Sequence, residues 1–230
     1  MKAALIARRE LGDIIGDRSF VLGLIGLAAI PLLLVNFGGP RIPAPLLLVF
    51  AVQAALFPTF MTVSVASSTF IQDKEGQTLL PLLAAPVNDS QIITGKLAAI
   101  FLPAAAASWV ALTIFYVAAS LRFGQGLVGS VLTPEMLYSL VVLSALLVLT
   151  LGSWAMVIAS RVRTVRAAQQ LSGILIAALY AGIAFAAQYL FQAFDGLLLV
   201  ALPLVILGLD IVALELARRL WGREEVIARI

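Results

Sequence analysis

Long uncharged runs alternate with short polar segments along the chain, and this pattern predicts membrane-spanning helices. Each run reaches the roughly 20 residues that a helix needs to cross a bilayer, or falls short only where Asp210 interrupts it. The expected spans cover residues 19–40, 42–72, 97–121, 136–160, 167–194 and 196–217. We therefore expect an all-α membrane protein with six transmembrane helices, built as a single domain over residues 1–230.

The first 18 residues differ from these runs because charged and apolar positions are interleaved. The apolar positions recur at helical spacing and include Leu5, Ile6, Leu11, Ile14 and Ile15. This predicts an amphipathic helix that lies along the membrane surface. The segment contains acidic residues and leads to no small-residue cleavage site, which argues against a signal peptide.

The segment 73–96 is the only long polar interruption that is itself patterned. Thr78 can cap a short helix, and Pro81 falls in its first turn, where a missing N–H costs little. Pro86 disfavours helix at the residue before it. The apolar residues of this short helix are Leu79, Leu80, Leu82 and Leu83, and the cap candidates for the next helix are Asn88, Asp89 and Ser90. The pattern predicts a short amphipathic helix between two spans, with a purely interfacial packing helix as the alternative.

Basic residues indicate how the chain is oriented. Thirteen of the 15 Lys and Arg residues fall in the terminal segments and the second and fourth loops, whereas the other side has only Arg41 and Arg122. The positive-inside rule therefore places both termini and the patterned loop in the cytoplasm. The outer loops, around residues 38–45, 122–135 and 195, are short. We expect a multi-pass protein of the cell inner (plasma) membrane that contacts lipid and no nucleic acid.

The amino-acid composition excludes several kinds of functional site. Hydrophobic residues make up 62% of the chain and charged residues 12%, and the mean hydropathy is +1.09, far from soluble proteins. The chain has no Cys and no His, which excludes disulfides, thiolate chemistry and imidazole ligands. Gly95-Lys96 is the only Gly-Lys pair, but Ser90 and Leu97 stand where a phosphate-binding loop needs Gly and Ser or Thr. We expect no catalytic, cofactor or metal site, and no enzyme activity, in this chain.

Polar residues inside the expected spans are functional candidates, because polar groups in hydrocarbon are costly. Those of the second span indicate either a translocation path or a helix-packing face, and include Gln53, Thr59, Thr62 and Ser64. Asp210 in the sixth span has either an ion-coupling role or a structural one, as the partner of an arginine or the cap of a helix. Prolines expected to kink the spans locally are Pro31, Pro58, Pro103 and Pro203.

The chain resembles the type-2 ABC transporter permease family in the order of its elements and in one motif. The motif reads Glu75-Gly76-x-Thr78-Leu79-x-x-Leu82-Leu83-x-x-Pro86 and is followed by Gly95-Lys96 at the third span. The stretch from Ser160 to Leu171 and the ending from Arg218 to Glu225 are similar to efflux-type permeases of that family. The resemblance in topology covers the whole chain, whereas the motif covers little beyond the patterned loop.

The resemblance implies an exporter subunit that forms a translocation path with a second permease copy, as a homodimer. The short helix of the loop would be the coupling helix, docked into a separately encoded ABC ATPase that binds ATP and Mg²⁺. The N-terminal helix would be a connecting helix that touches the same ATPase. The implied ATPase-coupling interface consists of Glu75, Gly76, Thr78, Leu79, Leu80, Leu82, Leu83 and Pro86.

Other hypotheses stay open at this point. An ion-coupled secondary carrier or channel could use Asp210, although such proteins usually need more buried acids than one. Haem-export-type permeases have a similar size and topology, but the absence of His excludes haem ligation through imidazole here. A membrane enzyme or scaffold lacks any supporting constellation of residues.

Overall fold

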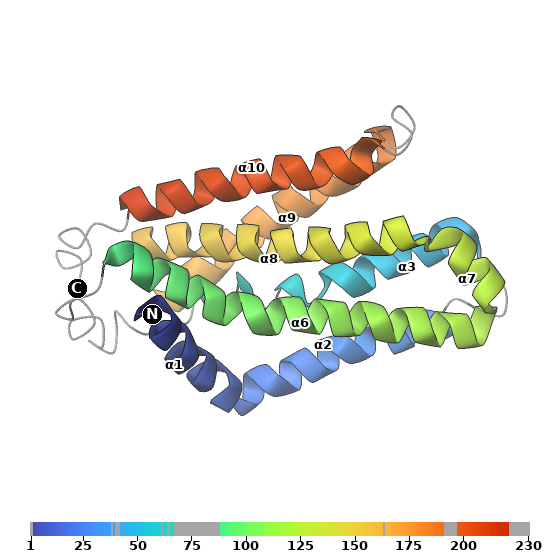
Figure 1. Cartoon of the computed structure of the whole chain (residues 1–230), viewed down its shortest axis with the longest axis horizontal. Helices are drawn as coiled ribbons and strands as arrows, with labels where there is room; N and C mark the ends of the chain where they lie inside the picture. The colour runs from blue at the N-terminus through green and yellow to red at the C-terminus, as the bar shows by residue number, and fades with distance from the viewer. Residues whose placement is uncertain are drawn as a thin grey trace.

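The computed structural model shows a bundle of helices and no strand among the residues that it describes. These residues are 2–37, 39, 42–60, 62–63, 65–66, 88–162, 164–190 and 197–220. Their helices are α1 (Lys2–Gly16), α2 (Arg18–Phe37), α3 (Ala44–Leu56), α6 (Asp89–Phe123), α7 (Gln125–Val131), α8 (Pro134–Arg161), α9 (Val165–Leu190) and α10 (Leu197–Leu220). The long helices follow the long axis of the molecule, and α1 lies at an angle across one end (Figure 1). The expected all-α fold is confirmed for this part of the chain.

The start of α6 differs from the expected third span at 97–121. Asn88 is the N-cap of this helix, and its backbone N–H donates to the Gln91 side-chain Oε1 at 3.2 Å. This cap, one of those expected from the sequence, lets the helix begin at Asp89 although its first residues are polar. The last eight residues of the expected loop 73–96 therefore belong to α6.

The expected loop at 122–135 contains a short helix, α7, that the hydrophobic pattern did not predict. Gly124 separates α6 from α7 with φ at +87°, a backbone conformation that glycine adopts without steric cost. Thr133 then caps α8, and its Oγ1 accepts a hydrogen bond from the Met136 N–H at 3.4 Å. The connection between the two longest helices is thus largely helical.

The expected second span at 42–72 is interrupted at its proline. Helix α3 ends at Leu56, residues 57–58 form a turn, and helical residues resume at Thr59. Pro58 has no N–H to donate to the preceding turn, and the Thr59 hydroxyl donates to the Leu56 carbonyl oxygen at 2.6 Å. The other three expected prolines lie inside α2, α6 and α10, at Pro31, Pro103 and Pro203.

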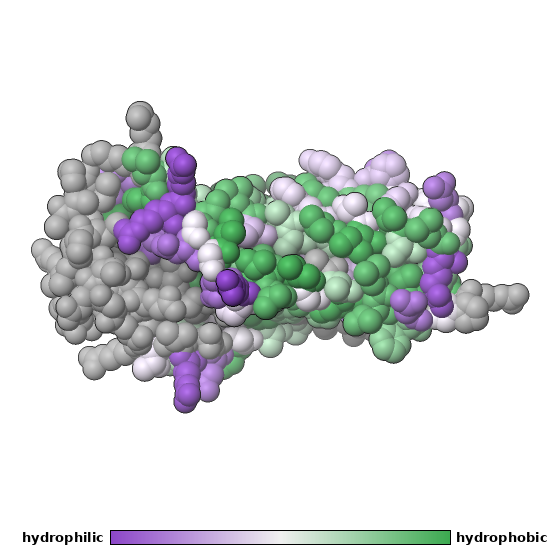
Figure 2. All heavy atoms as spheres, turned by 90° about the horizontal axis from the view of Figure 1, so that it is seen from below, coloured by the Kyte–Doolittle hydropathy of each residue, from purple (hydrophilic) through white to green (hydrophobic). Residues whose placement is uncertain are grey.

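Three helical stretches of the described chain are long and apolar enough to cross a membrane, namely Arg18–Phe37, Ser90–Phe123 and Pro134–Ala159. Figure 2 shows a largely hydrophobic surface over the middle of the molecule, with hydrophilic side chains mainly toward its two ends. Large apolar side chains are exposed along α2, α6 and α10, which suits lipid as the surrounding medium. The chain is thus built as a membrane protein, and the full set of six spans stays a prediction.

Helices α6 and α8 form the centre of the bundle. Helices α1, α2 and α3 pack on α6, whereas α9 and α10 pack mainly on α8. One cluster of buried apolar side chains joins α1, α6 and α8 and includes Ile14, Ile92 and Ala155. A second cluster, toward the other end of α6, includes Leu47 and Phe115. Each end of the bundle therefore has a packed core of its own.

The two ends of the described chain lie at the same end of the bundle, where α1 begins and α10 finishes (Figure 1). Helix α6 also begins there. This agrees with an even number of passes, and which side of the membrane this end faces stays a prediction.

Candidate functional site

The predicted ATPase-coupling residues lie outside the described part of the chain. They are Glu75, Gly76, Thr78, Leu79, Leu80, Leu82, Leu83 and Pro86. The structure does describe the positions between which this segment runs. Ala66 is buried in the same apolar cluster as Ile92 and Ile93 of α6, and Asn88 caps that helix. Described residues on either side of segment 67–87, Ala66 before it and Ile92 after it, thus belong to one packed core.

Helix α1 crosses the first turns of α6 at a glycine. A Cβ atom added to Gly95 would lie 2.9 Å from the Ala3 carbonyl oxygen and 2.9 Å from the Ile6 Cβ. Such distances are too short for a real Cβ contact, because interiors are close-packed and the nearby atoms belong to backbone and to a stiff β-branched side chain. Gly95 therefore lets the two helices approach more closely than any other residue would.

A buried ion pair joins the same two helices one residue further along α6. The Lys96 Nζ lies 2.8 Å from the Glu10 Oε1, with 0% of the Lys96 side chain and 14% of the Glu10 side chain exposed. A buried charge is tolerated only when it is paired and hydrogen-bonded. The pair, together with Gly95, therefore fixes the register and the crossing point of α1 on α6. We call this contact the α1–α6 junction.

Our sequence interpretation missed this ion pair, although the pattern contains a signal for it. Glu10 lies four residues from both Ile6 and Ile14, and Lys96 likewise has an isoleucine four residues to either side. Residues four apart share one face of a helix. Each charge therefore lies in the middle of an apolar face, and a charge in that position needs a partner of opposite sign.

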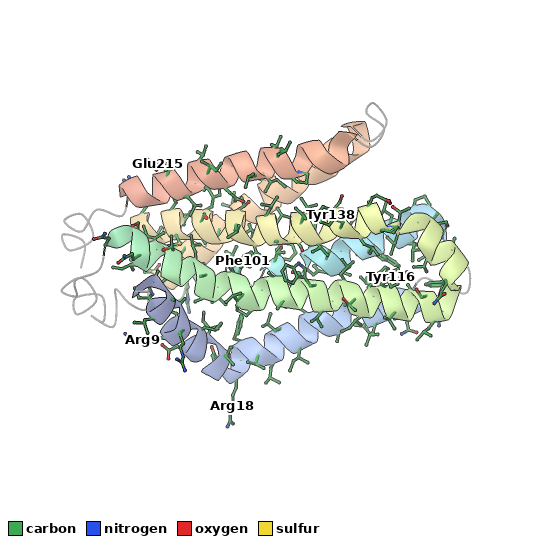
Figure 3. All side chains as sticks on the ribbon, in the orientation of Figure 1. Arg9, Arg18, Phe101, Tyr116, Tyr138 and Glu215 are labelled. Carbon is green, nitrogen blue, oxygen red and sulfur yellow. The ribbon has the colours of Figure 1, made fainter. Side chains whose placement is uncertain are left out.

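The outer face of α1 combines apolar and basic residues. Leu5 and Ile15 are exposed, as are Arg8 and Arg9. Figure 3 shows Arg9 and Arg18 pointing away from the bundle. Exposed apolar and basic side chains on one helix are typical of a helix that lies on a membrane surface. This agrees with the expected placement of α1.

Asp17 links α1 to α2. Its Oδ1 accepts hydrogen bonds from the Ser19 hydroxyl at 2.6 Å and from the Ser19 N–H at 2.9 Å. These bonds favour the ionised carboxylate and hold the pKa of Asp17 below its usual value.

The polar candidates of the second span are largely buried. Thr59 and Thr62 are buried and Gln53 is half-buried, whereas Ser64 lies outside the described residues. The Thr62 Oγ1 has no hydrogen-bond partner in the described part of the chain. Its Cγ2 lies close to Gly152 of α8, 3.6 Å from where a Cβ on that glycine would be. Thr62 therefore faces α8.

Asp210 lies on the stripe through which α10 packs on its neighbours. This stripe consists of Ile206, Asp210 and Ala213, which are buried while most of the residues between them are exposed. Asp210 is 2% exposed, and neither carboxylate oxygen has a hydrogen-bond partner among the described residues. Neither of the structural roles expected for it, pairing with an arginine or capping a helix, is seen within this part of the chain.

Thr150 of α8 lies beside the Asp210 carboxyl group. Its hydroxyl, however, donates to the Leu146 carbonyl oxygen of its own helix at 3.0 Å. We call the contact of α10 with α8 around Asp210 the α8–α10 interface.

Two of the described polar candidates, Thr62 and Asp210, approach α8 from different directions. Thr62 approaches α8 at Gly152, whereas Asp210 approaches it at Thr150. A helix turns about 100° per residue, so positions two residues apart point about 200° away from each other. Thr62 and Asp210 therefore contact opposite sides of α8.

Within the described chain, no group of three or more acidic residues is placed to hold a metal ion. The chain contributes no histidine or cysteine ligand at all. The described residues offer packed helix contacts and two buried ionisable side chains, Lys96 and Asp210.

The chain matches a known protein family. The family model described as ABC-2 family transporter protein matches residues 18–184. The match extends from the start of α2 into α9 and includes Lys96 and segment 67–87, but neither Glu10 nor Asp210. No curated protein matches the chain.

Proposed function

The chain belongs to the ABC-2 transporter family, and on that premise we propose that it is the permease subunit of an ATP-driven exporter. Members of this family are membrane transport components rather than enzymes, and they normally work with an ABC ATPase subunit. The family match over residues 18–184 is the observation that carries the proposal. The apolar surface of the helices supports it (Figure 2).

In this proposal segment 67–87 couples ATP hydrolysis by the partner subunit to movement of this chain. A separate ABC ATPase binds ATP and Mg²⁺ on the cytoplasmic side of the inner membrane, and this chain binds neither. The apolar face of the coupling helix seats in a groove of the ATPase and consists of Leu79, Leu80, Leu82 and Leu83. The residues that shape the two ends of this helix are Glu75, Gly76, Thr78 and Pro86.

The α1–α6 junction gives a physical reason why such a segment could transmit motion. Ala66 and Ile92, near the two ends of the segment, are buried in one cluster, and the ion pair between Lys96 and Glu10 ties α1 to the start of α6. Packed helices move as rigid bodies, whereas a flexible tether would absorb a displacement. A push on the coupling helix is therefore passed to α6 and α1 together.

The translocation path needs a second copy in this proposal. Thr62 and Asp210 face opposite sides of α8, so one chain does not enclose a continuous polar path through them. A homodimer would provide two copies of the bundle and a path between them. Closure of the two ATPase subunits would then rock the bundles and move the substrate outward.

The proposal is tested by coexpression of the chain with a candidate ABC ATPase, such as one found in a neighbouring open reading frame, and by copurification of the two. The double variant Leu82→Arg plus Leu83→Arg places charges on the expected docking face and should abolish copurification. Gln77→Arg adds a charge to the same segment outside the leucine face and should leave copurification intact. Size-exclusion profiles in detergent show whether both variants stay folded. Full ATPase binding by a folded double variant would refute the coupling role.

A second candidate function is an ion-driven carrier that uses Asp210. The absence of a described hydrogen-bond partner for its carboxylate favours this candidate. Reconstitution of the chain alone in vesicles separates the two functions. Flux driven by an ion gradient without ATP, and abolished by Asp210→Asn, would replace the exporter proposal.

A further inference from the structure

We propose that Asp210 is a proton-binding site and that its bound proton holds α10 against α8. This inference goes beyond the proposed function, because it concerns the chain itself and requires no ATPase. It rests on the burial of Asp210, on the lack of a partner for its carboxylate and on the position of Thr150.

An ionised carboxylate without a partner would be costly at the buried position of Asp210. Asp210 is 2% exposed, and no described group donates a hydrogen bond to either of its oxygens. An isolated ionised carboxylate in such surroundings costs far more than a neutral one, so a carboxyl group without a partner takes up a proton. The packed arrangement of α10 therefore selects the neutral form of Asp210.

The Thr150 hydroxyl can still accept a hydrogen bond in this arrangement. Its hydroxyl proton is already used in the bond to the Leu146 carbonyl oxygen, so it has no proton to donate to a carboxylate. A hydroxyl oxygen also has lone pairs that accept. A protonated Asp210 can donate to Thr150 with this bond intact. An ionised Asp210 could accept a hydrogen bond from Thr150 only if the hydroxyl gave up its bond to the Leu146 carbonyl oxygen. Thr150 therefore accommodates the protonated form without rearrangement, and the burial of Asp210 is what disfavours the ionised form.

The helices that pack against α10 also carry charged and titratable groups. On α8 the nearest ones in sequence to Thr150 are Tyr138 and Arg161, more than 15 Å away at about 1.5 Å per residue. On α6, Lys96 is engaged with Glu10 of α1, and the Arg122 guanidinium lies over the Phe123 ring near the other end of that helix. None of these groups supplies a counter-charge at the level of Asp210.

On α10 itself the neighbouring acid is Glu215, five residues further along. It is exposed and lies on the outer side of the helix (Figure 3). Arg218 and Arg219 follow at least two turns from Asp210. Among the side chains that the structure describes, no cation lies at the level of Asp210, so a proton from solution is the cation that neutralises it in the packed arrangement.

The consequence is a helix contact that depends on proton binding. Three buried residues, Ile206, Asp210 and Ala213, form the described contact stripe of α10. When Asp210 releases its proton to water, the carboxylate left behind must be hydrated, and hydration requires α10 to move away from α8. Proton release and separation of the two helices are thus one event.

Infrared spectroscopy of the purified chain in lipid vesicles tests proton binding directly. A protonated carboxyl group has a C=O stretching band that is separate from the bands of a carboxylate. We expect such a band at neutral pH, its loss at alkaline pH and its absence from Asp210→Asn. Glu215→Gln, which removes an exposed acid of the same helix, should keep the band. A spectrum without an Asp210-dependent carboxyl band would overturn the proposal.

A cysteine reporter tests the helix movement, because the chain has no cysteine of its own. Ala213→Cys places a thiol on the stripe, where the residue is 0% exposed, and Val212→Cys places one at a site that is 57% exposed. The thiolate is the species that reacts with N-ethylmaleimide, and its population depends on the surroundings of each site. Measuring both cysteines in the Asp210→Asn background at the same pH corrects the ratio of their rates for this difference. The ratio reports the opening of the α8–α10 interface.

We expect this ratio to rise about tenfold per pH unit while the protonated form predominates, since each opening releases one proton. In the Asp210→Asn background the ratio should be independent of pH, and in the Glu215→Gln background it should rise as in the unmodified chain. A ratio that stays constant through the pH range in which the carboxyl band disappears would overturn the link to α10. A failure of ATPase copurification would leave both measurements unaffected.

Discussion

The described part of the chain buries two ionisable side chains, Lys96 and Asp210, and surrounds them differently. At the α1–α6 junction, Lys96 is fully buried with its Nζ 2.8 Å from the Glu10 Oε1, and Gly95 brings the two backbones together. At the α8–α10 interface, Asp210 is buried as deeply but no described group hydrogen-bonds to its oxygens. One contact contains both members of an ion pair, and the other contains a single acid.

This difference separates a contact that is built to persist from one that can change with its surroundings. Removing either partner of an ion pair in a packed core leaves the other charge buried and uncompensated, so the contact of α1 with α6 depends on both partners being present. A lone buried acid stays packed only while it carries a proton. The rigid contact adjoins the segment that we expect the ATPase to grip, whereas the responsive one lies on the other side of α8.

Removal of one member of the ion pair should give the largest effect on stability. Glu10→Leu leaves the charge of Lys96 next to an apolar side chain, and we expect the free energy of unfolding to fall by about 3–5 kcal/mol. Asp210→Asn, the matching change at the other contact, replaces a neutral carboxyl by a neutral amide and should shift it by less than about 1 kcal/mol. Denaturant titration of the purified chains in detergent measures both values.

The double variant Glu10→Leu plus Lys96→Met provides the control. Replacing a whole buried ion pair by apolar residues of similar size is often close to neutral, so this variant should recover most of the stability lost in Glu10→Leu. If the two single substitutions were simply additive, or if Asp210→Asn were as damaging as Glu10→Leu, the contrast between the two contacts would not hold.

Enlarging Gly95 should give the next largest effect. In Gly95→Ala the new methyl group would meet the Ala3 carbonyl and the Ile6 Cβ at 2.9 Å, so α1 must shift away from α6. We expect a loss of about 1–3 kcal/mol in the free energy of unfolding, which is typical of overpacking. The same titration measures it.

Two glycines serve as matched controls for that substitution. Gly12 of α1 and Gly208 of α10 have nothing within 4 Å of an added Cβ. Alanine in these helices should be neutral or stabilising by up to about 1 kcal/mol, because it has the higher helix propensity. Equal losses at Gly12, Gly95 and Gly208 would show that close approach at the α1–α6 junction is not the cause.

Local features of this fold could be predicted from the sequence, whereas contacts between distant segments could not. The amphipathic N-terminal helix and the cap at Asn88 follow from residues within a few positions of each other. The ion pair joins Glu10 to Lys96, 86 residues apart, and only the packing of α1 on α6 decides that these two charges meet. The isoleucines around each charge are a signal that it needs a partner, but they do not identify that partner.

In the candidate site, too, local features could be predicted from the sequence and contacts between helices could not. The burial of Asp210 follows from its place within an apolar run, but its lack of a partner depends on which face of α8 it meets, and periodicity does not give that face. The break at Pro58 shows the reverse case, because a local rule about the missing N–H predicted a kink and the helix stops there. The leucines of the coupling segment lie outside the described residues and stay a prediction.

Asp17 extends the comparison to an acid that is fully exposed, and it should give the smallest effect. Its two bonds to Ser19 lower its pKa, so its contribution is present above the pKa of the unfolded chain and is lost as the pH falls through the folded-state pKa. Asp17→Asn should lower Tm at neutral pH by at most about 2 °C, and the difference should vanish in acid. Asp13→Asn, which removes an exposed charge from α1, should leave Tm unchanged. If Asp17→Asn lowered Tm equally at every pH, the amide would fail for steric reasons. If the two Tm values become equal in acid, as predicted, the charge of this exposed carboxylate matters only through its hydrogen bonds.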